Sequence, residues 1–239
     1  MFIDKYKTLT LNTADGRAIR VRLQVNPRAK RLILRLDQKK GEAVAVAPSA
    51  RKLKDAEKFA ADRLDWIAKH LDAQPEPIAL TEGAIIPLRG QPCRITCEGT
   101  GRLAKLIEGT PQILSLPGAP ETLPARAIRA LKKQAKADLT SAVERHAATL
   151  NVIPARISVK DTRSRWGSCS HERSLSFSWR LVLAEPFVLD YVAAHEVAHI
   201  LEMNHSAAFW ANVERTYPDW RRARDWLKTN GQSLHAVGA

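Results

Sequence analysis

Two histidines and a glutamate stand in a spacing that suits metal-assisted hydrolysis: His195, Glu196 and His199. On a helix, residues four apart lie on one face about one turn apart, so both imidazoles can bind the same Zn²⁺. Glu196 adjoins this face, from which its carboxylate can take the proton of an attacking water and deliver it to the leaving group. The pattern predicts a zinc-dependent hydrolase with Glu196 as the catalytic base.

The third zinc ligand is less evident, because a catalytic zinc needs three protein ligands and one open position. His205 lies six residues beyond His199, just after the point near Met203 where we expect the helix to end and the chain to turn back. Metzincins share this histidine spacing but place a glycine at the bend, where this chain has Glu202. This difference argues against a metzincin. Glu202 and Glu214 also compete with His205 as candidates for the third ligand of a single zinc ion.

Other residues that bind metals or act as nucleophiles lack a supporting pattern. His146 lies near the apolar face of a predicted helix without a partner motif, so we expect a packing or surface role. Cys93 and Cys97 have no second pair to complete a zinc box, and no base is identifiable for Cys169. We therefore interpret the cysteines as free thiols. The chain also lacks a glycine-rich phosphate loop, which argues against a P-loop NTPase.

The elements that must position the site follow from hydrophobic periodicity. Alternation in residues 19–25, 32–36 and 44–46 predicts strands in an antiparallel meander, followed by a helix over 49–71 and short strands over 84–116. Helices are predicted over 124–150, 186–203, 206–216 and 218–229, and strands over 157–159 and 174–179. Strands first and helices later indicate an α+β protein. We expect an N-terminal β-rich accessory region over 1–120 and the hydrolase domain over 121–239.

Charge is the unusual feature of the composition. The 239 residues carry a formal net charge of +13, and 45% of them are hydrophobic, which excludes intrinsic disorder. Residues 1–74 hold 17 Lys/Arg against 9 Asp/Glu, whereas 151–239 hold 11 against 9. The excess thus belongs to the N-terminal region, as a solvated basic face or as a surface for nucleotides or nucleic acid.

The chain's location follows from what the sequence does not contain. No apolar run approaches the roughly 20 residues that cross a bilayer, and the first residues do not resemble a secretory signal. Three scattered cysteines do not make a disulfide framework. We expect a cytoplasmic protein without a membrane partner.

The sequence resembles the YgjP-like metallopeptidase family, which is related to SprT-like and WLM zinc proteases. Three stretches carry the resemblance: residues 163–170 (RSRWGSCS), 191–199 (YVAAHEVAH) and 203–206 (MNHS). The resemblance implies a zincin-like domain in which His195, His199 and His205 bind zinc and Glu196 is the catalytic base. It favours His205 over both glutamates.

The stretch 163–170 also has an interpretation of its own. Zincins commonly bind an extended substrate along an edge strand beside the motif helix, and residues 174–179 are a candidate for that strand. Arg163 or Arg165 can stabilise an oxyanion, with Trp166 beside them at the substrate; alternatively all three are structural. Tyr217 is a further possible oxyanion donor.

These features make a metallo-endopeptidase acting on peptides or proteins the leading prediction. One alternative keeps the metal site and cleaves a phosphoanhydride, as in nucleoside triphosphates, for which the basic charge, Arg163 and Arg165 would be suited. The other is a nucleic-acid-associated protease, as the kinship to SprT-like proteins suggests.

Overall fold

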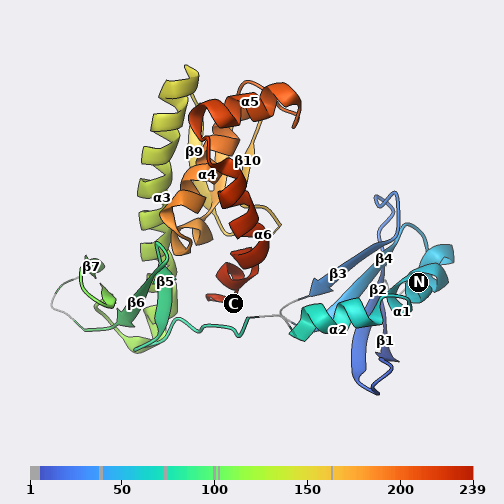
Figure 1. Ribbon diagram of the computed structural model, residues 1–239. Helices are drawn as coiled ribbons and strands as arrows, with labels where there is room; N and C mark the ends of the chain where they lie inside the picture. The colour runs from blue at the N-terminus through green and yellow to red at the C-terminus, as the bar shows by residue number, and fades with distance from the viewer. Residues whose placement is uncertain are drawn as a thin grey trace. The chain divides into compact units, whose positions relative to one another are not determined.

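The computed structural model describes residues 6–37, 40–72, 75–98, 101, 103–162 and 164–238. The chain divides into two compact units, residues 1–75 and 76–239 (Figure 1). Strands dominate the first part of the chain and helices the later part, so the α+β prediction is confirmed.

The N-terminal unit contains a four-stranded sheet. Its strands are β1 (Tyr6–Asn12), β2 (Ala18–Val25), β3 (Ile33–Asp37) and β4 (Glu42–Ala47), in the spatial order β1-β2-β4-β3. The predicted antiparallel meander is wrong at one pair, because β2 and β4 run parallel and β3 lies at the outer edge. Every residue of β4 is buried, so burial favours an interior place for β4 over one at the edge.

Two short helices cover one face of this sheet, where a single helix is predicted. After a 3₁₀ turn (Ala50–Lys52), α1 (Leu53–Ala61) and α2 (Leu64–Asp72) are separated at Asp62 and Arg63. The break does not divide the core, to which both helices contribute. The core of this unit combines both helices with β2 and β4: Ile19, Val21, Leu23, Ala43, Ala45, Ala47, Ala56, Ala60 and Ile67.

The C-terminal unit begins with a second sheet, made of β5 (Ile85–Leu88), β6 (Gln91–Thr96), β7 (Lys105–Ile107) and β8 (Gln112–Ser115) in the order β5-β6-β8-β7. Arg89 and Gly90 form the β5–β6 turn with φ of 53° and 74°, a two-residue turn with both φ values positive. Their N–H groups donate to the carbonyls of Val182 and Leu183. The Arg89 guanidinium also makes two hydrogen bonds to Asp138, at 2.9 and 2.8 Å.

These contacts place the division of the chain at 75/76 and not at the predicted 120/121. Ile86, Cys93 and Ile95 of the second sheet are fully buried and belong to the same core as Leu131 and Val188 of the helices. Because the sheet buries its apolar side against the helices, residues 76–120 fold with the C-terminal part. Figure 1 shows β5, β6 and β7 gathered at the beginning of α3 (Leu123–Leu150).

A three-stranded sheet follows α3, which ends at Asn151 in the left-handed conformation, φ 54°. The strands are β9 (Arg156–Lys160), β10 (Gly167–Cys169) and β11 (Ser174–Ser178), in the order β10-β11-β9. The expectation that 174–179 is an edge strand is wrong, because β11 lies between the other two. The strand beside the motif helix is β10, which sequence periodicity missed because it has only three residues.

A 3₁₀ turn (Pro120–Thr122) precedes α3, and another (Trp179–Leu183) follows β11. Three helices then complete the unit: α4 (Pro186–Ala198), α5 (Ala207–Thr216) and α6 (Trp220–Ala236). The central helix is α4, which contacts α3, α5, α6 and β10 (Figure 1). It ends at Ala198, five residues before the expected end, because the N–H groups of Ile200 and Leu201 bond three residues back and tighten the turn. Within the described residues, no helix has the length and apolar character needed to cross a membrane.

Candidate metal centre

The two motif histidines lie at the end of α4. His195 is in its last turn, and His199 caps its C-terminus with helical dihedral angles, φ −64° and ψ −17°. The two rings therefore face the same side, with centroids 4.9 Å apart. This confirms the same-face placement predicted from their spacing.

A short loop returns the chain and brings His205 to this pair. The Asn204 side chain accepts a hydrogen bond from the Ser206 N–H at 3.0 Å, and the Ser206 hydroxyl accepts from the Phe209 N–H at 3.3 Å, which caps α5. Phe209 is fully buried, and its ring centre lies 4.8, 4.4 and 4.8 Å from those of His195, His199 and His205. All three imidazoles thus pack against the ring of Phe209.

The nitrogen atoms of these rings converge. One ligand atom from each of His195, His199 and His205 lies within 4.8 Å of the others, and no further group of this kind is found among the described residues. The Nε2 atoms of His195 and His205 are 3.1 Å apart. Two nitrogens on one tetrahedral zinc, each about 2.0–2.1 Å from the metal, are separated by about 3.3 Å. The donor set therefore fits a zinc ion.

The protonation of the rings agrees with that fit. The Nδ1–H of His199 donates to the Glu202 carbonyl at 2.9 Å, which leaves its Nε2 lone pair available for a metal. Burial lowers the pKa of His195 to about 3, reinforced by the neighbouring His199 and His205, and burial also lowers the pKa of His199. Neutral imidazole is the form that binds metal.

Packing, more than hydrogen bonding, orients two of these histidines. His195 Nδ1 is buried without a hydrogen-bond partner among the described residues, and its ring contacts Tyr191 and Trp210. His205 is exposed, and Trp210 lies nearly parallel to it at 6.0 Å. Trp210 in turn stacks on Trp220 at 4.2 Å. The stack connects His205, on a loop, to the buried start of α6.

Glu196 lies on the inner side of α4, with only 6% of its surface exposed. Burial raises its pKa to about 8, and the positive charge of Arg165 opposes that rise. Gly167 of β10 packs directly against it: a Cβ built on Gly167 would lie 2.5 Å from Glu196 Cγ. The backbone of β10 therefore limits where the carboxylate can go.

The three residues predicted to contact substrate have different outcomes. Arg163 lies outside the described residues. Arg165 is exposed, has no ion-pair partner in the part of the chain that is described, and is close enough for its charge to act on Glu196. Trp166 stacks on His235 at 4.7 Å, and a Cβ on Gly231 would lie 3.1 Å from its ring, so it anchors β10 to α6.

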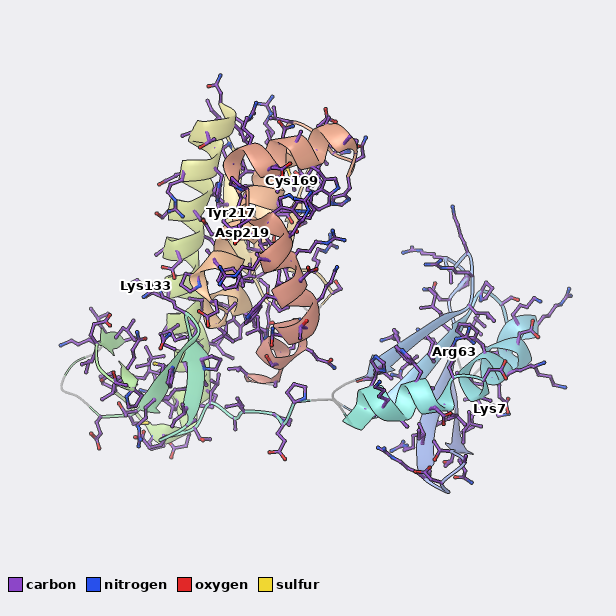
Figure 2. All side chains as sticks on the ribbon, viewed as in Figure 1. Lys7, Arg63, Lys133, Cys169, Tyr217 and Asp219 are labelled. Atoms are coloured by element: carbon purple, nitrogen blue, oxygen red, sulfur yellow. The ribbon has the colours of Figure 1, made fainter. Side chains whose placement is uncertain are left out.

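The remaining candidates lie outside the histidine group. Glu202 and Glu214 do not belong to it, and Glu214 pairs with Arg221 at 3.4 Å. Tyr217 is labelled in Figure 2, and its hydroxyl donates to the Phe187 carbonyl at 2.9 Å, which connects it to the start of α4. His146 is buried, as a packing role requires, and bonds Thr216 and Asp190 at 2.7 and 3.1 Å.

The cysteines are unpaired thiols, as predicted. Cys169 lies on β10 and is labelled in Figure 2. Burial raises its pKa to about 11, with a further contribution from the charge of Glu196. A thiol with that pKa stays protonated at neutral pH, which makes it a poor nucleophile.

Sequence reasoning missed Gly167 as a contact of Glu196, and Trp210 as a contact of His205. The only sequence signal for Gly167 was its place in the 163–170 stretch, and for Trp210 its place after the MNHS segment. Neither signal shows what the residue touches, because both contacts join segments that are brought together by folding.

Comparison with known proteins gives a family. The profile of the YgjP-like family, described as a metallopeptidase domain, matches residues 30–230. No curated protein matches the chain significantly. The crystal structure of the metallopeptidase zymogen of Pyrococcus abyssi abylysin aligns with 39% of this chain and 95% of its own, with 19% identity and a TM-score of 0.37. The family match, which spans most of the sequence, indicates a metal-dependent peptidase, and the chain belongs to the YgjP-like metallopeptidase family.

Proposed function

We propose that the protein is a zinc-dependent metallo-endopeptidase in which His195, His199 and His205 bind one Zn²⁺ and Glu196 transfers the proton. The observation that carries the proposal is the convergence of three imidazole nitrogens within 4.8 Å, next in sequence and space to a buried carboxylate. Three histidines leave a tetrahedral metal one open position, which is the arrangement of catalytic zinc sites.

Zinc held there would polarise the scissile carbonyl, lower the pKa of a water and, as a nearby positive charge, favour the ionised form of Glu196. The ionised Glu196 carboxylate accepts a proton from the water that attacks the peptide carbonyl carbon. It then delivers that proton to the leaving nitrogen as the C–N bond breaks, which yields a carboxylic acid and an amine. Packing against Gly167 keeps the carboxylate in place between the two transfers.

Arg165 supports a role at the substrate. It is exposed beside Glu196 and lacks an ion-pair partner within the described residues, so its guanidinium is available to an anionic or carbonyl oxygen. We assign it to stabilising the substrate's carbonyl oxygen as negative charge develops there. Trp166 lines the same cavity as Glu196 and would contribute an apolar wall at the substrate. Arg163 remains a prediction from the sequence.

The first test measures bound zinc per chain. His199→Ala and His205→Ala are expected to purify with little zinc, whereas His146→Gln, a buried histidine outside the group, is expected to retain it. Unchanged zinc in His199→Ala would refute the ligand assignment.

The second test concerns the reaction. Glu196→Gln is expected to retain zinc and to lose about 10²–10⁴-fold in peptide cleavage, because the amide cannot accept the proton. Nucleoside triphosphates belong in the same assay. Phosphate release without peptide cleavage would replace the peptidase with a phosphoanhydride hydrolase. A single three-histidine group among the described residues favours the peptidase, since two-metal sites are common in phosphoryl hydrolysis.

A second candidate function, association with nucleic acid, is favoured by one feature of the N-terminal unit. The Asn26 N–H donates to the Ala47 carbonyl, so the segments that follow β2 and β4 leave the sheet at the same end. The two densest basic segments, 28–31 and 51–54, therefore both begin at this end of the sheet. Their exposed basic residues are Arg28, Lys30, Arg31, Arg51, Lys52 and Lys54. Such a cluster suits a phosphate backbone.

The test is binding of labelled double-stranded DNA at several salt concentrations. Replacing Arg28 and Arg31 by Glu is expected to weaken binding at least about tenfold. Replacing Arg17 and Lys40 by Glu makes the same charge change in the turns at the opposite end, and is expected to have the smaller effect. Equal losses in both variants would show that the basic end is not the binding surface.

A further inference from the structure

A cavity of about 190 Å³ opens beside the proposed catalytic residues. Glu196 and His195 form one of its walls. The other lining residues come from three elements that are far apart in sequence: Trp166 and Gly167 at the start of β10, Tyr191 and Val192 on α4, and Leu227 on α6. Whatever enters this cavity therefore lies next to the reacting groups.

Away from Glu196 and His195, the lining is mainly apolar. Trp166, Val192 and Leu227 offer hydrocarbon and indole surface, and Gly167 has no side chain to occupy the space. The volume exceeds that of an engineered cavity of about 150 Å³ that binds benzene. The space is thus large enough for an aromatic ring or a branched aliphatic side chain, and its walls disfavour a charged one.

The cavity is also preformed, and Tyr191 is its one polar lining residue besides Glu196 and His195. Trp166 is fixed by its stack on His235 and by the close approach of Gly231, so its wall cannot collapse inward without moving α6. Tyr191 is only 6% exposed, and its hydroxyl has no hydrogen-bond partner among the described residues. A bound peptide can supply that partner through a backbone carbonyl or amide.

We infer that this cavity receives the substrate side chain adjacent to the scissile bond and selects a bulky apolar or aromatic residue there. The inference rests on the proposed function, because only a substrate cleaved at Glu196 places its scissile bond beside the cavity. It adds a substrate class that neither the metal ligands nor the family match specifies.

The main experiment compares peptides that differ at one residue, with Phe, Leu, Ala, Asp or Lys in turn, using the zinc-loaded full chain. We expect kcat/KM to be at least about tenfold higher for Phe and Leu than for Ala, Asp and Lys at one of the two positions flanking the cleaved bond. Leu227→Trp fills the cavity and should abolish this preference. Lys228→Ala, at the next position on α6, alters an exposed residue paired with Asp225 and should leave it unchanged.

A second variant keeps the inference testable if Leu227→Trp does not fold. Leu227→Ala enlarges the cavity and is expected to shift the preference towards Trp over Leu. Cleavage by the wild type without preference for bulky apolar residues would overturn the inference and leave the peptidase proposal intact. A preference that survives both Leu227 substitutions would overturn it as well.

A binding measurement separates the inference from catalysis. Isothermal titration of the zinc-loaded protein with 3-phenylpropionate and with propionate isolates the contribution of the phenyl group, which we expect to be at least about tenfold in Kd and to disappear in Leu227→Trp. A phenyl-dependent gain without any peptide cleavage would support the cavity as an apolar subsite and refute the peptidase. Equal binding of the two acids would overturn the inference.

Discussion

The backbone of Gly167 lies against the side chain of Glu196, so closely that a Cβ at residue 167 would be 2.5 Å from Glu196 Cγ and Oε1. The contact joins the short strand β10 to the last turn of α4. Both residues have little freedom to move, because Gly167 lies on β10, which pairs with β11, and Glu196 is buried. The glycine is therefore part of what positions the carboxylate.

Gly167→Ala is expected to displace Glu196 and reduce kcat about 10²-fold, since a displacement of about 1 Å has effects of that size. Bound zinc should remain at the wild-type level, because the atoms that a Cβ at residue 167 would meet first belong to Glu196 and not to the three histidines. Ser168→Ala on the same strand is the control and should retain activity. Wild-type kcat in Gly167→Ala would show that Glu196 relaxes without cost.

Trp210 is expected to strengthen zinc binding by holding His205. Trp210→Leu removes the stack that runs from His205 to Trp220 and should weaken zinc affinity about 10–100-fold, the range for residues that orient metal ligands. Trp210→Phe should recover part of the affinity. Trp226→Leu, whose indole contacts Phe187, is the control. Competition with a chromophoric chelator measures each Kd, and a wild-type Kd in Trp210→Leu would contradict the assignment.

Removal of zinc is expected to destabilise the C-terminal unit selectively. Binding at a free zinc concentration one hundred times Kd contributes about 2.7 kcal/mol, which corresponds to roughly 5–10 °C in Tm for a unit of this size. Calorimetry with and without a chelator measures the shift. His199→Ala should show none, and the transition of the N-terminal unit should not move. A shift of equal size in His199→Ala would mean that zinc binds elsewhere.

Asp190 is expected to stabilise the C-terminal unit in a pH-dependent way. Burial alone would raise its pKa, but the hydrogen bond from His146 and the charges of His146 and Arg145 outweigh burial and lower it. Since the folded-state pKa is depressed, the stabilisation is complete above the unfolded pKa of about 3.9 and is lost as pH falls through the folded value. Asp190→Asn should therefore cost about 1–2 kcal/mol at pH 7 and progressively less below about pH 4.

Asp225→Asn is the matched control for Asp190. Asp225 is exposed, and its one ion pair within the described residues is with Lys228 of its own helix, so its replacement should change the free energy of unfolding by less than about 0.5 kcal/mol. Urea unfolding at several pH values gives both numbers. A cost for Asp190→Asn that is constant from pH 7 to pH 3 would contradict the linkage.

Local patterns in the sequence predicted most of the secondary structure. The boundaries of α3 were predicted to within one residue, because Pro124 suits a first turn and Asn151 readily adopts the left-handed conformation that ends the helix. The pairing of β2 with β4, the break at Asp62 and the existence of β10 were not predicted. These depend on which surfaces pack together, and an alternation of apolar residues does not encode the partner of a strand.

The placement of His195 and His199 on one face, with Glu196 beside them, could be predicted from the sequence because the period of a helix is a local property of the chain. Three other relationships depend on how distant segments pack. His205 reaches the same point, Gly167 lies against Glu196, and Trp166, Tyr191 and Leu227 line a cavity there. These relationships join α4, the loop before α5, β10 and α6. Only the shared core, which buries the apolar sides of all these elements together, brings such distant segments into contact.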